Sequence, residues 1–149
     1  MQIYHIAKKE SKELKESEDI IHKALLDFID STGDDWNYIT PEDLNKKDLS
    51  KYYLLDVRKN DVFKKGHIKG AKNIFWMDVL KPENLKKLPK NRRIVIICYV
   101  GHTASQIMVA LRLLGYKASV LKFGMGQSPV EGVPVAGWLD FGFEIVKGN

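Results

Sequence analysis

The chain has 149 residues, of which 44% are hydrophobic and 29% charged, and its formal net charge is +5. These values are ordinary for a globular protein, and the length fits one domain with a substantial core. No stretch approaches the roughly 20 apolar residues of a transmembrane helix. The first ten residues are not followed by the apolar segment of a secretory signal. We therefore expect a cytoplasmic protein without a membrane partner.

The positive charge by itself does not predict nucleic-acid binding. The densest basic stretch, residues 81–93, contains one acidic residue, Glu83, and no aromatic residues on which bases could stack. A solvated surface loop explains it better. The excess charge still favours small anionic substrates or an acidic partner. We expect a monomer.

The N-terminal part predicts two helices. Residues 10–32 have one apolar face, and Gly33 is a plausible stop. Residues 34–37 resemble a turn. Thr40-Pro41-Glu42-Asp43 is typical of the start of a short helix, since Thr40 can cap and proline suits the first helical position.

Apolar segments that alternate with helical stretches predict an α/β fold. The strand candidates are residues 52–57, 71–75, 94–97 and 118–121. Their order indicates a central, mostly parallel sheet flanked by helices on both faces. The segment from Gly124 to the C-terminus is rich in glycine and proline but holds Trp138, Phe141 and Phe143, so we expect it to be ordered and packed on the domain.

Cys98, the only cysteine, has an informative setting. It ends the apolar run Ile94–Ile97, and a short loop leads from it to a helix expected from Ala104 onward. At such a junction backbone N–H groups and the positive end of a helix converge, which stabilises a thiolate. The alternative is a buried structural cysteine with no chemistry, which is common.

Other site chemistries fit less well. The four histidines show no metal-ligand spacing and the cysteine has no partner, so we expect no metal and no cofactor. In a cysteine-protease dyad a histidine acts as the base for the cysteine. His102 is too near Cys98 in sequence to be oriented easily for this role, whereas His67 remains a candidate. A cysteine phosphatase needs an arginine six positions after the cysteine, where this chain has Ala104. The glycines at 124 and 126 lack the third glycine of a dinucleotide-binding loop.

Four segments follow one another within residues 38–127: Leu54-Leu55-Asp56-Val57-Arg58, Phe63–Ala71 with its Gly-His-Ile-Lys-Gly-Ala turn, the strand that ends at Cys98 with its loop through Thr103, and Leu121–Met125. In this order they resemble the rhodanese family of sulfurtransferases. The Cys-Tyr-x-Gly-x-Thr-Ala form of the loop resembles a recognisable variant within the family. The resemblance implies a rhodanese-like domain over residues 36–149, preceded by a helical extension over residues 1–35.

The resemblance also implies a reaction. Cys98 would attack the outer sulfur of an anionic donor such as thiosulfate, carry it as a persulfide and pass it to cyanide or a thiol. The donor would be bound by the loop residues, and three further residues would support the site. The loop residues are Tyr99, Val100, Gly101, His102 and Thr103, and the supporting ones are Asp56, Arg58 and His67. We expect these three to be structural rather than catalytic.

One departure keeps a rival hypothesis open. Many family members carry a basic residue where this loop ends in Thr103, and His102 is the only titratable basic group of the loop. Val62 likewise stands where the family often has glutamate. The rival is a non-catalytic rhodanese-like binding or regulatory module. The cysteine and the small and polar loop residues favour the enzyme.

Overall fold

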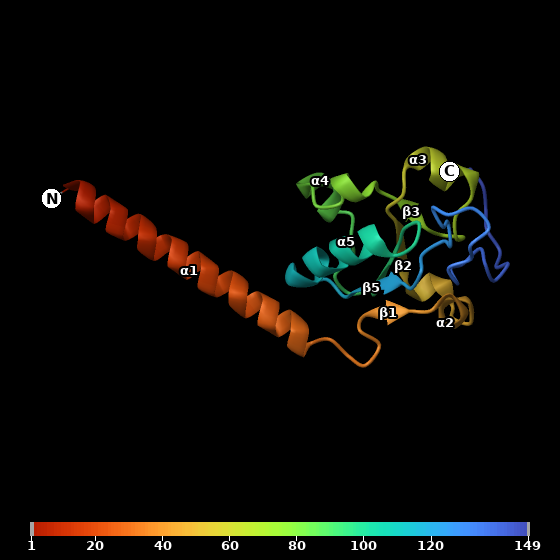
Figure 1. Cartoon of the computed structure of the whole chain (residues 1–149), viewed down its shortest axis with the longest axis horizontal. Coiled ribbons are helices and arrows are strands. Elements are labelled where there is room, and N and C mark those ends of the chain that lie inside the picture. Colours follow the sequence, from red (N-terminus) through yellow and green to blue (C-terminus); the bar gives the residue numbers. More distant parts are fainter. Residues whose placement is uncertain (1, 149) are drawn as a thin grey trace. The chain divides into compact units, whose positions relative to one another are not determined.

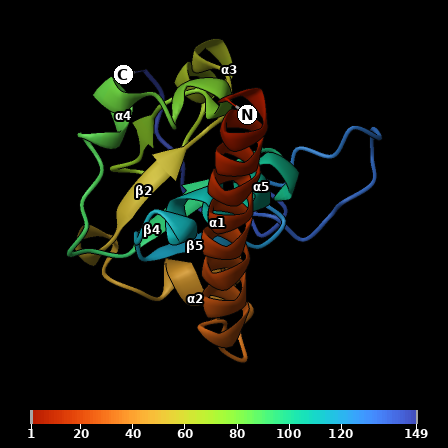
Figure 2. The same ribbon diagram turned by 90° about the vertical axis from the view of Figure 1, so that its left-hand side faces the viewer.

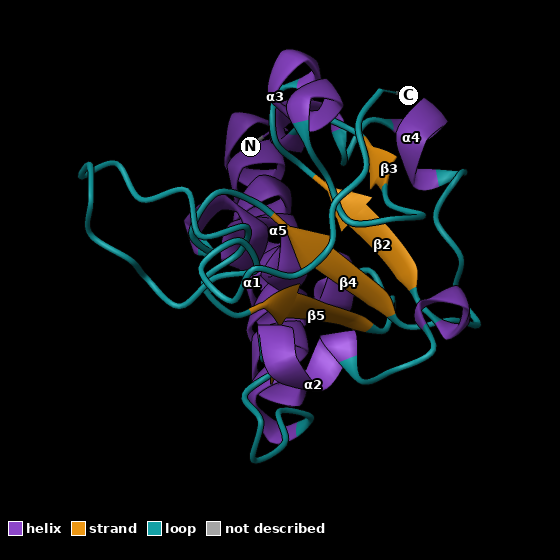
Figure 3. Ribbon diagram, turned by 90° about the vertical axis from the view of Figure 1, so that its right-hand side faces the viewer, coloured by secondary structure: helices purple, strands orange, loops and turns teal. Residues whose placement is uncertain are grey.

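The computed structural model describes residues 2–148, and the side chains of residues 9–148. The chain divides into two compact units, residues 1–32 and 33–149. Most of its helices and strands are labelled in Figure 1, and β4 is labelled in Figure 3. The helices are α1 (Gln2–Asp30), α2 (Pro41–Asn45), α3 (Asn60–Lys65), α4 (Pro82–Leu85) and α5 (His102–Leu113), and the strands are β1 (Tyr38–Ile39), β2 (Tyr53–Asp56), β3 (Lys72–Asn73), β4 (Ile94–Ile97) and β5 (Ala118–Leu121).

The first unit is one continuous helix, α1. It begins at Gln2, eight residues before the predicted start at residue 10. Two Lys–Glu pairs and one Lys–Asp pair at i,i+4 spacing lie on its surface. Large apolar side chains along the helix remain exposed: Leu14, Ile20, Ile21, Leu25, Leu26 and Ile29. In the part of the chain that the structure describes, no helix has the length and apolarity needed to cross a membrane.

The second unit contains a five-stranded sheet in the order β1-β5-β4-β2-β3. Every neighbouring pair is parallel, which confirms the predicted α/β fold with a parallel sheet. Figure 3 shows that neighbouring strands are rotated relative to one another, which is the usual twist of a sheet. Both edge strands have only two residues, which limits the unpaired edge. The sequence pattern missed β1 and overestimated β3, because runs this short carry no recognisable periodicity.

Both faces of the sheet are covered. Side chains alternate along a strand, so Val95 and Ile97 point into one layer and Ile94 and Ile96 into the other. The first layer is a core cluster that joins the sheet to Leu44 of α2 and Phe63 of α3. Helix α5 packs on β4 and β5 and buries four of its side chains: Ala104, Ile107, Met108 and Leu111.

The short helix α2 forms where the capping pattern predicts it. The Thr40 side chain accepts a hydrogen bond from the Asp43 backbone N–H at 3.1 Å, and Pro41 is the first helical residue. The segment after β5 projects as a long loop, visible in Figure 2, and then returns to the domain. There Trp138 is buried in the core cluster and its indole N–H donates to the Glu144 carbonyl at 3.0 Å. This part of the C-terminal segment packs on the domain, as expected.

Candidate active site

Cys98 lies directly after β4, in the middle of the sheet. It is only 1% exposed, and its Sγ accepts a hydrogen bond from the Gly101 backbone N–H at 3.0 Å. An N–H donor aimed at sulfur stabilises the negative charge of a thiolate. Because β4 is completely buried, this strand fixes the position of Cys98 at its carboxyl end.

The loop after Cys98 is shorter than the sequence suggests. Helix α5 begins at His102 rather than Ala104, because Gly101 adopts a left-handed conformation (φ 101°) that turns the chain directly into the helix. No side chain caps this helix. Its first-turn N–H groups therefore lie next to the cysteine loop and give that end a partial positive charge.

The residues after β5 hold the cysteine loop from the side. The Met125 N–H donates to the Cys98 carbonyl at 2.9 Å, and the N–H groups of Gly126 and Gln127 both donate to the Tyr99 carbonyl at 3.1 Å. A Cβ added at Gly124 would lie 2.3 Å from the Cys98 carbonyl oxygen. Only glycine permits so close an approach of two backbones.

A second backbone layer supports this segment from behind. A Cβ at Gly137 would lie 2.2 Å from the Gly126 nitrogen. The Trp138 N–H donates to the Gly124 carbonyl and the Leu139 N–H to the Met125 carbonyl, both at 3.0 Å. The C-terminal segment, from Gly137 onward, therefore fixes residues 124–127, the glycine segment. The glycine segment in turn fixes the loop around Cys98.

Asp56 and Arg58 form a fully buried ion pair at the end of β2, with both side chains 0% exposed. Their closest contact, Arg58 Nη2 to Asp56 Oδ2, is 2.6 Å. The same guanidinium donates to the Gly66 carbonyl at 2.8 Å and to the Gln127 side chain at 2.9 Å. Arg58 thus links β2 to the end of α3 and to the segment that holds the cysteine loop. Among the described residues, no hydrogen bond joins Asp56 or Arg58 to the Cys98 sulfur.

His67 is buried and is held by Phe63 and by the C-terminal part of the chain. Its Nδ1 lies 2.9 Å from the Phe63 carbonyl, and its ring stacks on Phe63 at 3.7 Å. Its backbone pairs with Val146 of the C-terminal segment. These contacts are those of a turn residue held by its neighbours, and none of them joins His67 to Cys98.

The remaining predicted residues lie around the loop. Tyr99 is half-buried, and its hydroxyl accepts a long hydrogen bond from the Lys59 N–H at 3.4 Å. Val100 and Thr103 are half-buried, and His102 is exposed at the start of α5. The structure therefore gathers residues 98–103 at one end of the sheet and places Asp56 and Arg58 behind them.

Sequence reasoning missed several residues that shape this site. Gln127 binds Arg58, and Ser105 donates to the Gly101 carbonyl at 2.9 Å. The Tyr38 hydroxyl lies 3.1 Å from the Ser105 hydroxyl, which ties β1 to α5. The paired glycines 124 and 126 were the available clue, because glycines close after a strand end indicate a close backbone approach.

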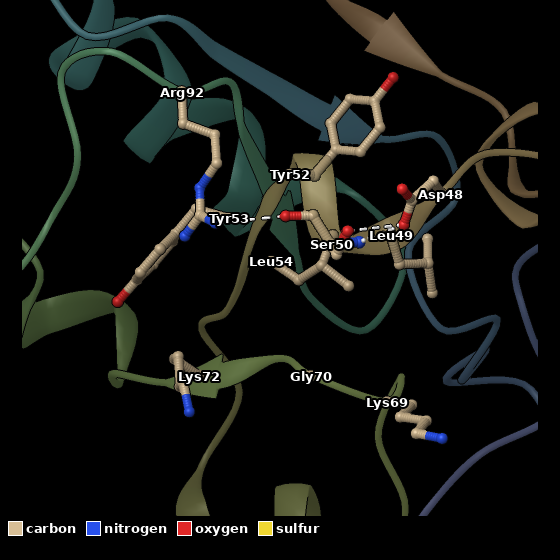
Figure 4. A pocket seen from close by; sticks show the side chains of 10 residues that line it. All are labelled: Asp48, Leu49, Ser50, Tyr52, Tyr53, Leu54, Lys69, Gly70, Lys72 and Arg92. Carbon is tan, nitrogen blue, oxygen red and sulfur yellow. Dashed lines mark hydrogen bonds between the residues drawn. The ribbon is translucent and has the colours of Figure 1, made fainter.

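Among the described residues, one cavity lies where β2 and β3 begin, and another extends along the β1 side of the sheet as far as the cysteine loop; Cys98 lines neither. One, of about 470 Å³, is shown in Figure 4 and lies where β2 and β3 begin. It contains none of the predicted site residues. The other, of about 1010 Å³, adjoins the cysteine loop through Val100, Gly101 and His102. No group of three or more His, Cys, Asp or Glu side chains that could hold a metal occurs in residues 9–148.

Residues 40–127, more than half of the chain, match the rhodanese-like domain family, with the cysteine loop inside the match. The chain belongs to the rhodanese-like domain family. This confirms the resemblance drawn from the four sequence segments. The rhodanese fold supplies the strand, loop and helix that surround Cys98. No curated protein matches the sequence.

Solved structures share this rhodanese-like fold. A rhodanese-related protein of Thermoplasma volcanium is 22% identical, with a TM-score of 0.62, over 74% of this chain and 97% of that one. A rhodanese-like domain protein of Staphylococcus aureus is 25% identical (TM-score 0.55) over 66% of this chain and 97% of that one. A thiosulfate sulfurtransferase of Pseudomonas aeruginosa is 19% identical (TM-score 0.58), over 75% of this chain and 19% of that one.

Proposed function

We propose that this protein is a sulfurtransferase that moves sulfane sulfur from an anionic donor such as thiosulfate to a thiophilic acceptor through a persulfide on Cys98. The observation that carries this proposal is the hydrogen bond from the Gly101 N–H to the Cys98 sulfur at 3.0 Å. This bond pairs the sulfur with one backbone donor, directly before the uncapped start of a twelve-residue helix. A buried structural cysteine needs no such arrangement. The thiosulfate sulfurtransferase among the similar structures supports the same reaction class.

In the first half-reaction the Cys98 thiolate attacks the outer sulfur of thiosulfate. A new S–S bond forms to Cys98, the S–S bond of thiosulfate breaks, and sulfite leaves with its electron pair. The N–H groups of residues 99–103 would bind the anionic donor and then the persulfide. No lysine or arginine lies in this loop, so backbone dipoles provide the electrostatic stabilisation.

In the second half-reaction cyanide or an acceptor thiolate attacks the outer sulfur of the persulfide. The S–S bond to Cys98 breaks, and Cys98 leaves as a thiolate, ready for the next donor. The stabilisation of that thiolate helps here also, because a stabilised thiolate is a better leaving group. No cofactor is required by this cycle. We propose that the protein acts in the cytoplasm as a monomer.

Intact-mass measurement after thiosulfate treatment tests the proposal. The wild-type chain should gain the mass of one sulfur atom, and cyanide should remove it with release of thiocyanate. Cys98→Ser should gain none, because a serine hydroxyl forms no persulfide and the chain has no second thiol. Circular dichroism of the variant checks that the fold is kept. A wild-type chain that gains no sulfur from thiosulfate or from a second sulfane donor, such as a polysulfide, would indicate the non-catalytic module instead.

A further inference from the structure

The larger cavity beside the cysteine loop has an aromatic lining that the sulfur chemistry itself does not require. One wall is the loop, at Val100, Gly101 and His102. The lining also includes Phe123, two residues after the end of β5, and Trp36, two residues before β1. All of them belong to the second unit of the chain.

Trp36 and Phe123 are unusual in two respects. They are 73% and 41% exposed, although both are large and apolar. Both also have left-handed backbones, with φ of 50° and 59°. Bulky residues rarely adopt this conformation, and where it persists it often marks a binding or catalytic site. Asparagine or glycine would fit these turns better, so a stability requirement alone does not explain the aromatic side chains.

The cavity reaches the chemistry through Gly101. This residue lines the cavity, and its N–H donates to the Cys98 sulfur. A Cβ at Gly101 would lie 3.6 Å from the Phe123 nitrogen, so the two backbones are close neighbours. A molecule seated against Phe123 therefore lies next to the residue that holds the sulfur.

The size and charge of the cavity indicate which reactant it fits. A volume of about 1010 Å³ is far larger than thiosulfate or cyanide needs, and it is in the range of sites for larger ligands. Its lining carries three carboxylates, Asp34, Asp35 and Asp43, and three basic residues other than histidine, Lys47, Arg93 and Lys122. Because these charges balance, the cavity does not select an anion, and the exposed aromatic rings provide the larger contact.

We propose that this cavity binds the sulfur acceptor, and that the acceptor is a cysteine-containing peptide segment with an apolar residue beside the cysteine. The proposal rests on the proposed sulfurtransferase function. The apolar side chain packs on Trp36 and Phe123. The positive and negative side chains of the lining accommodate the peptide backbone and the neighbouring side chains of the peptide. The acceptor cysteine first loses its proton to solvent. Its thiolate then attacks the outer sulfur, the S–S bond to Cys98 breaks, and Cys98 leaves as a thiolate while the acceptor becomes the persulfide.

Persulfide transfer to two synthetic peptides tests this assignment. Each contains one cysteine, flanked by leucines in the first and by glycines in the second. The wild-type persulfide should react with the leucine peptide about tenfold faster in kcat/KM, about 1.4 kcal/mol. Trp36→Asn and Phe123→Asn should each remove most of this preference. Asparagine tolerates the left-handed backbone, so these variants delete the ring with little added strain.

Met77→Asn is the matched control, because Met77 is also exposed and apolar but does not line the cavity. It should keep the full preference for the leucine peptide. Equal rates for the two peptides in wild type, or an unchanged preference in both cavity variants, would overturn this inference while the persulfide chemistry stood.

Calorimetric binding separates this inference from the sulfurtransferase proposal. The same leucine peptide with serine in place of cysteine cannot accept sulfur, but it should bind the wild type and lose at least fivefold in affinity in Phe123→Asn. If the protein forms no persulfide and this peptide still binds in a Phe123-dependent way, the sulfurtransferase proposal fails and the docking site stands. No binding, or binding insensitive to both variants, contradicts the docking site directly.

Discussion

The two ends of the parallel sheet use charged residues in opposite ways. At the carboxyl end, Asp56 and Arg58 are completely buried and bonded to each other. At the amino end, the cavity of Figure 4 is lined by the exposed Lys69, Lys72 and Arg92. Buried ions are costly unless each is paired, whereas exposed ones contribute little to stability.

The physical difference follows from what each end holds. The carboxyl end must keep four backbone segments in contact: the cysteine loop, the glycine segment, the C-terminal segment and the end of α3. Arg58 and the glycines 124 and 137 make these contacts. At the amino end Arg92 lies against the Tyr53 ring, 5.7 Å from its centroid, and donates a long hydrogen bond to the Ser50 carbonyl. Sequence change should therefore be far more harmful at the carboxyl end.

The largest effect is expected from replacing arginine by methionine at each end. Arg58→Met leaves the Asp56 carboxylate buried without its partner, which should lower the free energy of unfolding by about 3–5 kcal/mol. Arg92→Met should change it by less than about 0.5 kcal/mol. Urea unfolding followed by circular dichroism measures both.

A second variant covers the case in which Arg58→Met does not fold. Arg58→Lys keeps the charge but cannot hold Asp56 and Gln127 together, so it should fold with an intermediate loss. Equal stability of the Arg58 and Arg92 variants would mean that the buried pair does not distinguish the two ends.

Alanine at two glycines gives the next largest contrast. Gly124→Ala adds a Cβ at 2.3 Å from the Cys98 carbonyl oxygen. The left-handed strain and the overpacking should together cost about 2–4 kcal/mol. Gly70→Ala also has a positive φ, but nothing lies within 4 Å of the added Cβ. It should cost only the strain, about 1–2 kcal/mol.

The same pair has a chemical readout. Gly124→Ala should also slow persulfide formation, because it displaces the backbone of the cysteine loop, while Gly70→Ala should leave the rate unchanged. If both variants formed persulfide as fast as wild type, the close approach of the two backbones would not be what holds the loop.

A smaller effect is expected for His102, the only titratable side chain of the loop after Cys98 other than Tyr99. His102→Ala should raise KM for thiosulfate about two- to fivefold with little change in kcat, which corresponds to a weak, solvent-exposed charge interaction. Lys72→Ala at the amino end should leave KM unchanged. A KM for His102→Ala equal to that of wild type would assign donor binding to the backbone alone.

The smallest effect concerns Tyr53 and alkaline pH. Burial raises the pKa of Tyr53 above its ordinary value of 10.0, and the nearby Arg92 partly opposes this. The folded state then keeps the phenol proton to higher pH than the unfolded state does. The stabilisation is fully present below pH 10 and is lost as pH rises through the folded-state value.

Urea unfolding between pH 8 and pH 11 measures this effect in wild type and Tyr53→Phe. Wild type should lose more stability than the variant above pH 10. The loss relative to pH 8 should be compared, because the variant also lacks the hydroxyl. Identical pH dependence in the two proteins would show that burial does not raise the pKa of Tyr53.

Much of the fold was predictable because it depends on local patterns. The interior strands β4 and β5 match the expected ranges 94–97 and 118–121 residue for residue. The continuous β-branched run of β4 is typical of a strand covered on both faces. The cap at Thr40 was also predictable, because a capping hydrogen bond joins residues three apart.

The short edge strands and the start of α5 were not predictable in the same way. Tyr38–Ile39 is a strand only because β5 provides its partner. Helix α5 begins at His102 because Gly101 turns left-handed against the backbone of Phe123. Such contacts join residues far apart in the chain, and local composition carries no record of them.

The sequence by itself determined the parallel α/β fold and the position of Cys98 at the end of a buried strand before a helix, since both depend on local periodicity and on one recognisable loop. Only the tertiary structure decided what surrounds the cysteine. It directed Arg58 to Gly66 and Gln127, packed the C-terminal segment behind Gly124, and brought Trp36 and Phe123 to one cavity. These arrangements arise from backbone approach and burial between distant segments, which are properties of the folded chain rather than of any stretch of it.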